Sequence, residues 1–209
     1  MTSVELFLAF LAATAVFAYV PGPAVLYTAA QTVAGGRRAG FLASLGIHIG
    51  GYAHVFLAAF GLAAFLEAVP TAYLVMKIAG AAYLVWLGVK MIRSPEGVGA
   101  IEIAAPRTGG RAFLDSVVVE ALNPKVALFY VAFLPQFVDP SAAIAVWAQF
   151  VVLGVIVNVM FSSADVVTVI LSDRIVARAR RSNATVKWMQ RGAGAVLCGL
   201  GLKLALQKS

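Results

Sequence analysis

Six apolar runs, each at least as long as a helix that crosses a lipid bilayer, constrain the fold of this 209-residue chain most strongly. A helix of about 20 residues spans the hydrocarbon core of a bilayer. The runs cover residues 5–33, 41–66, 70–92, 113–138, 142–172 and 188–207. Hydrophobic residues make up 62% of the chain and charged residues 12%, whereas soluble domains contain about 45–50% and about 25%. The sequence therefore predicts an all-α membrane protein with six transmembrane helices.

Prolines interrupt the first and the fourth of these runs. Pro21-Gly22-Pro23 lies within the first run, and Asn123-Pro124 lies within the fourth. Proline cannot donate a backbone hydrogen bond, and it disfavours the α conformation in the residue before it. We therefore expect transmembrane helices 1 and 4 to break near their middles. Broken helices in matching positions of two halves are a sequence indication of a transporter's binding site.

A linker rich in glycine and proline, residues 94–112, divides the runs three and three. It separates a first three-helix unit, residues 1–93, from a second unit, residues 113–209, within one membrane domain. Each unit opens with a proline-interrupted run. Because each unit has an odd number of spans, the second would be inverted relative to the first, so we predict two inverted three-helix repeats.

The distribution of basic residues predicts the orientation in the membrane. Of the 16 Lys and Arg residues, 12 lie in or beside the connections after spans one, three and five, and the connections after spans two and four contain none. These 12 residues are Arg37, Arg38, Lys90, Arg93, Arg107, Arg111, Arg174, Arg178, Arg180, Arg181, Lys187 and Arg191. Positive residues concentrate in cytoplasmic loops, so we expect the linker in the cytoplasm and both termini outside. The same bias explains the net charge of +7 without a nucleic-acid partner.

Ionisable residues deep in a transmembrane helix are costly, by about 2.5–3.5 kcal/mol each, and indicate functional sites. Glu120 and Lys125 lie on either side of the Pro124 interruption. They could form an internal ion pair, or they could flank a binding cavity in which Glu120 exchanges a proton. The half-helix that restarts after each interruption presents unpaired N–H groups, which suit a carboxylate.

The fifth run contains a regularly spaced set of polar residues. Asn158, Ser162, Asp165 and Thr168 step by four, three and three positions, so they share one helix face. This stripe could line a path through the protein, or it could join helices by hydrogen bonds. Asp165 joins Glu120 as a candidate for carrying a coupling ion.

Several other classes of site find little support in the sequence. His48 and His54 are six positions apart, which is a poor spacing for a metal pair on a helix, and we predict no metal site. Cys198 is the only cysteine, so no disulfide and no thiol relay are expected within the chain. The chain has no phosphate-binding glycine loop and no hydrolase motif, so we predict neither an enzyme nor a cofactor.

Gly46 and Gly50 permit close helix packing, either within one chain or in a homodimer.

Several short motifs, in order along nearly the whole chain, resemble the LysE/RhtB family of bacterial amino-acid exporters. The motifs are Pro21-Gly22-Pro23, Gly36-Arg37-Arg38-Ala39-Gly40, residues 80–88, Asn123-Pro124-Lys125 and residues 133–137. The resemblance implies a small exporter of amino acids or their derivatives, located in the bacterial inner membrane and driven by an ion gradient. It carries a substrate-binding role to Pro21, Gly22, Pro23, Asn123, Pro124 and Lys125, to which the position of Glu120 adds a seventh candidate.

The leading hypothesis is therefore a secondary exporter that works by alternating access. Its partners would be an amino acid, protons or another coupling ion, and the lipid bilayer. The amino acid's carboxylate would lie against a half-helix N-terminus or Lys125, and its amine against Glu120, Asp165 or freed carbonyl groups. Protonation of Glu120 or Asp165 would couple inward proton flow to export. The alternatives are an exporter of a metal or other inorganic cation, and a membrane scaffold that transports nothing.

Overall fold

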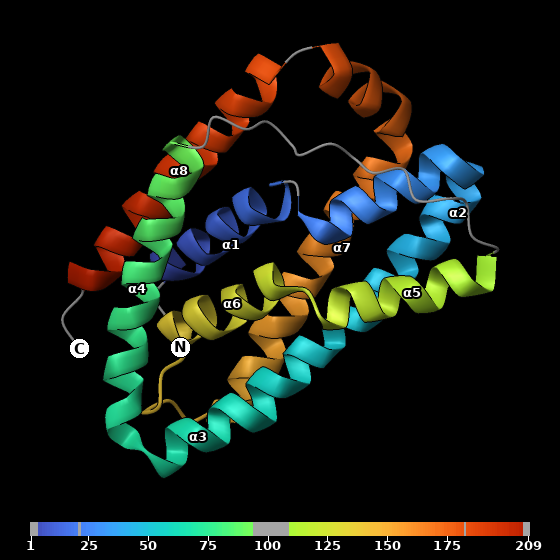
Figure 1. The fold of residues 1–209 in the computed structure, drawn as a ribbon. Helices are drawn as coiled ribbons and strands as arrows, with labels where there is room; N and C mark the ends of the chain where they lie inside the picture. The colour runs from blue at the N-terminus through green and yellow to red at the C-terminus, as the bar shows by residue number, and fades with distance from the viewer. Residues whose placement is uncertain (1–3, 21, 94–108, 182, 207–209) are drawn as a thin grey trace.

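A computed structural model describes residues 4–20, 22–93, 109–181 and 183–206, and within these ranges the chain is helical with short connections and no strand (Figure 1). This confirms the prediction of an all-α protein. Three helical stretches in the described ranges are long and apolar enough to cross a membrane: Pro23–Ala68, Gly110–Phe137 and Val146–Leu171. These lengths and compositions support the membrane assignment.

The first apolar run forms two helices rather than one. Helix α1 (Val4–Ala18) ends before the proline motif, and α2 (Pro23–Phe56) begins at Pro23, with Gly22 in an extended conformation as its N-cap. Proline suits the first position of a helix because its missing N–H would have no partner there. We call residues 19–22 the first junction; Pro21 lies outside the described residues.

Helix α2 is bent where the sequence predicted a connection between spans one and two. Gly36 has φ 75° and ψ 179°, a backbone conformation that other residues rarely adopt, and it divides α2 into two segments. The second segment continues through a π-helical segment, η1 (Leu57–Leu62), into α3 (Ala63–Ala68). This long helical stretch packs against both α5 and α7.

The fourth apolar run is also divided into two helices. Helix α5 (Gly109–Ala121) is followed by α6 (Pro124–Phe133), which runs into the short 3-10 turn η2 (Leu134–Phe137). Asn123 is the N-cap of α6, and Pro124 occupies the first helical position. We call residues 122–123 the second junction.

Three longer helices complete the described fold. Helices α4 (Pro70–Arg93) and α8 (Asn183–Leu206) lie side by side, and α7 (Val146–Arg181) crosses behind the centre of the molecule (Figure 1). Glycines allow α4 and α8 to approach closely, because a Cβ on Gly194 would lie 2.5 Å from the Gly88 carbonyl oxygen. Such contacts between small residues are typical of helix pairs in membranes.

The Gly46 and Gly50 pair packs within this chain. A Cβ on Gly46 would lie 2.5 Å from the carbonyl oxygen of Phe113, and one on Gly50 would lie 2.5 Å from that of Val117. Both glycines therefore face α5, and they bring the α2 and α5 backbones together. Close α2–α5 packing fixes the position of the second junction relative to α2.

Stacked phenylalanines fill the space between α1, α6 and α7. Phe17 of α1 lies 4.3 Å from Phe129 of α6 between ring centroids, Phe129 lies 4.3 Å from Phe133, and Phe161 of α7 lies 5.4 Å from Phe129. Phe17, Phe129 and Phe133 are at most 2% exposed. This aromatic core starts beside the two junctions and continues along α6 toward η2.

Candidate functional site

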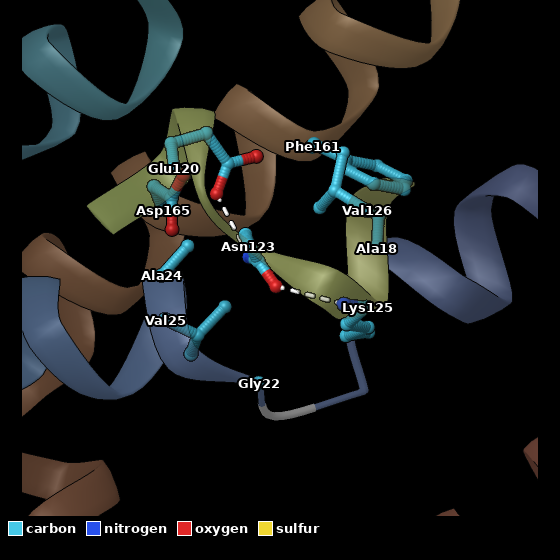
Figure 2. A pocket seen from close by; sticks show the side chains of 10 residues that line it. All are labelled: Ala18, Gly22, Ala24, Val25, Glu120, Asn123, Lys125, Val126, Phe161 and Asp165. Atoms are coloured by element: carbon cyan, nitrogen blue, oxygen red, sulfur yellow. Dashed lines mark hydrogen bonds between the residues drawn. The ribbon is translucent and has the colours of Figure 1, made fainter. Parts of the chain in front are cut away.

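The two junctions meet at one small cavity, together with one face of α7. Figure 2 shows the ten side chains that line it. They are Ala18, Gly22, Ala24 and Val25 around the first junction, Glu120, Asn123, Lys125 and Val126 around the second, and Phe161 and Asp165 on α7. The structure thus gathers five of the predicted site residues, while Pro23 and Pro124 start the adjoining helices. The cavity volume is about 20 Å³, which is enough for roughly one water molecule.

Hydrogen bonds from one side chain, that of Asn123, fix the second junction. Its Oδ1 accepts a hydrogen bond from the Lys125 backbone N–H at 3.1 Å, and this bond caps α6. Its Nδ2 donates to Oε2 of Glu120 at 2.9 Å. Glu120 and Asn123 are each 2% exposed. Because both ends of the amide are engaged, the Glu120 carboxylate is held in a defined position.

The ammonium group of Lys125 reaches across to the first junction. Its Nζ donates to the backbone carbonyl of Val20 at 2.6 Å and to that of Phe17 at 3.1 Å. It also lies 4.5 Å from the centroid of the Phe17 ring. The last carbonyls of a helix lack intrahelical partners and form the negative end of its dipole. Lys125 therefore binds the C-terminal end of α1, and it does not form the ion pair with Glu120 that the sequence left open.

The N-terminus of α2 differs because no side chain caps it. Gly22 has no side chain to accept a hydrogen bond, although its carbonyl accepts from the Leu26 N–H at 2.9 Å. Pro23 has no N–H, so the first N–H groups of α2 belong to Ala24 and Val25, and helix geometry gives these no intrahelical acceptor. Both residues line the cavity. The positive end of the α2 dipole is thus directed at the site.

Asp165 is a buried acid without a complete set of hydrogen bonds. It is 1% exposed, and its Oδ1 has no hydrogen-bond partner among the described residues. Its side chain lies next to those of Glu120 and Ala24 (Figure 2). Unpartnered buried polar atoms are uncommon in folded proteins and call for an explanation, often a functional one. The cavity thus contains two carboxyl groups and one ammonium group, and the ammonium is already bound to α1.

Comparison with known proteins decides the family. Residues 15–208 match the model of the LysE type translocator family. The chain belongs to the LysE family. It is therefore a membrane transport protein rather than an enzyme, as the motif resemblance implied.

Several relatives of this LysE-family chain are membrane proteins. An uncharacterized membrane protein of Pseudomonas aeruginosa is 32% identical over 197 residues, covering 89% of this chain and 88% of the relative. One of Vibrio cholerae is 28% identical over 99% of both chains. A leucine efflux protein of Salmonella choleraesuis is 35% identical over 126 residues, covering 59% of this chain and 58% of the relative. No solved structure matches the chain.

In this LysE-family chain, the polar stripe on α7 both joins helices and contributes to the cavity. The stripe consists of Asn158, Ser162, Asp165 and Thr168. Asn158 Nδ2 donates to the His48 carbonyl at 3.0 Å, and Ser162 Oγ lies 2.6 Å from Nδ1 of His48, so these two residues join α7 to α2. Thr168 donates to the carbonyl of Ala164 within its own helix. Of the four stripe residues, Asp165 is the one that lines the cavity.

The histidines are bonded in ways that do not favour a metal. His54 Nε2 lies 2.8 Å from the backbone carbonyl of Glu120, and His48 contacts Ser162. Among the described residues, no group of three His, Cys, Asp or Glu side chains could hold a metal ion.

Sequence reasoning missed the apolar wall of the cavity. Ala18, Val126 and Phe161 line the side opposite the carboxylates (Figure 2). Nothing distinguishes them in the sequence, because each lies among many apolar residues in a transmembrane run. Sequence reasoning also missed Ala24 and Val25, although they directly follow the proline motif and lie in the first turn of the helix that starts at Pro23.

Proposed function

We propose that the chain is a secondary exporter of amino acids or their derivatives, with its binding site at the cavity between the two junctions. The observation that supports this most strongly is the meeting of two helix ends and two helix starts at one cavity. Non-helical backbone at membrane depth is tolerated where it lines a cavity or is buried in protein. Membership of the LysE family and the leucine efflux proteins among its relatives support the substrate class.

The charges around the cavity suit a zwitterion. We propose that the substrate carboxylate binds the N–H groups of Ala24 and Val25 at the start of α2, since anions bind well at helix N-termini. The substrate's ammonium group would bind one of the two cavity carboxylates, that of Glu120 or that of Asp165. Lys125 is the weaker candidate for the carboxylate because its ammonium already binds the Phe17 carbonyl of α1 and the Val20 carbonyl of the first junction.

The cavity must enlarge for this function. A volume of about 20 Å³ admits roughly one water molecule and no amino acid. We therefore propose that the two junctions move apart when substrate binds, as an alternating-access transporter requires. The solute-sized space that the sequence suggested would be present in another conformation of the protein.

We propose that the six predicted spans form two inverted three-helix repeats, residues 1–93 and 113–209. Three features support this arrangement. Each half contains a helix that stops shortly before a proline-started helix, α1 before α2 and α5 before α6. The final long helices of the two halves, α4 and α8, lie side by side. The basic residues favour the inner membrane with the linker, residues 94–112, in the cytoplasm and the termini outside.

A growth and export assay tests the function. Cells that overproduce the protein and receive single amino acids or dipeptides should accumulate less of the true substrate than cells with an empty vector. Leucine and other apolar amino acids are the first compounds to test. Equal accumulation of every compound in the panel would contradict the proposal.

Proton coupling through Glu120 or Asp165 needs a second assay. In proteoliposomes, Glu120→Gln and Asp165→Asn are compared in leucine counterflow and in uptake driven by a pH gradient. We expect at least one substitution to abolish gradient-driven uptake and to leave counterflow intact. If neither substitution separates the two activities, neither carboxylate carries the coupling proton.

A further inference from the structure

The two carboxylates of the cavity differ in their hydrogen bonding, and this difference distinguishes their roles. Glu120 Oε2 accepts a hydrogen bond from Asn123 Nδ2, and the opposite end of the same amide is held by the Lys125 N–H. Asp165 Oδ1 has no partner among the described residues, although the side chain is almost completely buried. One acid is therefore held in a network, and the other is not.

Proton binding at Glu120 would disturb the second junction. A proton on Oε2 would weaken the bond from Asn123 Nδ2, since a hydroxyl oxygen is a poorer acceptor than a carboxylate oxygen. Turning the amide over would place its nitrogen against the Lys125 N–H, and the cap of α6 would be lost. A proton on Oε1 would still remove the negative charge that strengthens the bond from Asn123. Glu120 is thus poorly suited to repeated protonation.

Asp165, unlike Glu120, is suited to repeated protonation. A buried carboxylate that lacks a hydrogen-bond partner is strongly destabilised, and either a proton or a cation at the free oxygen relieves this. The ammonium group of an amino acid is such a cation. One oxygen cannot hold a proton and accept an ammonium in the same place, so the two ligands compete for Asp165.

The charged groups around Asp165 act on it in opposite directions. Among the lining residues, α5 contributes the carboxylate of Glu120 and α6 the ammonium of Lys125, while α1 and α2 contribute no charged side chain. Lys125 is held by the carbonyls of Phe17 and Val20, so its charge is not free to pair with Asp165. The N-terminal end of α2 adds a positive dipole on the Ala24 side.

We propose that Asp165 is the residue that exchanges a proton for the substrate's ammonium group, and that Glu120 is a positioning residue that stays bonded to Asn123. This inference rests on the proposed exporter function. A proton from outside would bind Asp165 and would leave toward the cytoplasm as the ammonium of a cytoplasmic amino acid replaces it. No other bond changes. Mutual exclusion at one carboxylate gives antiport when the empty site does not reorient between the two faces of the membrane.

Infrared spectroscopy of the purified protein tests this assignment without a transport assay. Films of wild-type protein are titrated with acid, and the C=O stretching band of each protonated carboxyl group is followed. Difference spectra against Glu120→Gln and Asp165→Asn assign the bands of the cavity acids. Glu67→Gln and Asp139→Asn serve as controls, because both acids lie outside the cavity. Gel filtration verifies that each variant is folded.

Leucine is then added at a pH at which the assigned band is present. We expect leucine to remove a carboxyl band in wild type and in Glu120→Gln, and no such band to exist in Asp165→Asn. 4-Methylpentanoate, which is leucine without its ammonium group, should leave the band unchanged. If Asp165→Asn does not fold, Asp165→Glu replaces it, and the leucine-sensitive band should shift in that variant alone.

Two results would overturn the inference. The first is a leucine-sensitive band that is lost in Glu120→Gln and retained in Asp165→Asn. The second is an equal response to leucine and to 4-methylpentanoate. A third result is an Asp165 band that titrates with acid but does not change when any of the common amino acids is added. It would contradict the exporter function and the ammonium exchange, and it would leave Asp165 as a proton-binding group.

Discussion

The two junctions have similar sequences, but their helix ends are stabilised in different ways. At each, a proline occupies the first position of a new helix, but Asn123 precedes one proline and Gly22 precedes the other. Asn123 caps its own helix and holds Glu120, so the second junction is satisfied largely from within. The first junction depends on Lys125, which reaches over from the second. The second junction is therefore a fixed support. The first junction is linked to it by one long side chain and leaves a helix N-terminus open toward the cavity.

The largest effect should come from removing the link between the junctions. Lys125→Met keeps the apolar stem but loses two hydrogen bonds from a charged donor, each of about 1.5–3 kcal/mol. We expect the free energy of unfolding in detergent to fall by about 3 kcal/mol and export of the amino acid that the growth assay identifies to be lost. Lys125→Arg keeps the charge and should lose less stability. A Lys125→Met protein as stable as wild type would show that the first junction does not depend on this link.

Removing the cap of the second junction should have the next largest effect. Asn123→Ala takes away the α6 cap and releases the Glu120 carboxylate, and loss of an N-cap costs about 1–2 kcal/mol. We expect a fall of that size in the free energy of unfolding. Asn123→Asp keeps the cap but places a second negative charge beside Glu120, so it should recover the cap without recovering transport. Equal transport by both variants and wild type would contradict the supporting role of Asn123.

A methyl group at the first junction should weaken the link without removing it. Gly22 has φ −139°, which any residue can adopt, but a Cβ there would lie 2.7 Å from Cδ of Lys125. Gly22→Ala should therefore displace the lysine stem, with a cost of about 1–2 kcal/mol, in the range of overpacking substitutions. Gly199→Ala is the matched control, because its Cβ would meet nothing within 4 Å. Thermal unfolding of both variants tests the difference, and equal melting temperatures would count against the close contact.

Replacing the prolines should change the free energy of unfolding least among these substitutions. Pro23→Ala and Pro124→Ala each add a backbone N–H at a position where no helical partner is needed. We expect each to change the free energy of unfolding by about 0.5–1 kcal/mol, mainly through the unfolded state. A loss of several kcal/mol in Pro124→Ala would mean that proline, and not Asn123, maintains the second junction. Denaturant titration of the two variants side by side provides the measurement.

Several residues that the sequence singled out lie together in the structure. Prolines that cannot continue a helix located both junctions, and charged residues in apolar runs identified Glu120, Lys125 and Asp165. All three now line the same cavity. The cost of unpaired backbone and of charge in a membrane can be read from single positions, and this is why the sequence singles out these residues. Their roles in binding and ion coupling stay predictions.

The pairing within the site could not be predicted in the same way. Glu120 and Lys125 are close in sequence, yet Lys125 bonds to carbonyls 105 and 108 positions away. That choice depends on how α1 and α6 are placed in space, which local sequence does not specify. The partner of Gly46 and Gly50 and the role of Phe161 depend on packing in the same way. The inverted repeat and the orientation in the membrane stay predictions.

Protection of a single cysteine at the cavity tests most directly whether the two junctions form the substrate site. Because Cys198 is the only cysteine, Cys198→Ala gives a background in which Ala24→Cys can be labelled alone by a small thiol reagent. We predict that saturating leucine, or another amino acid exported by the cells, slows labelling at this position. The same solute should not affect a cysteine at Gly199. Labelling of Ala24→Cys at an unchanged rate with every exported amino acid would contradict the account.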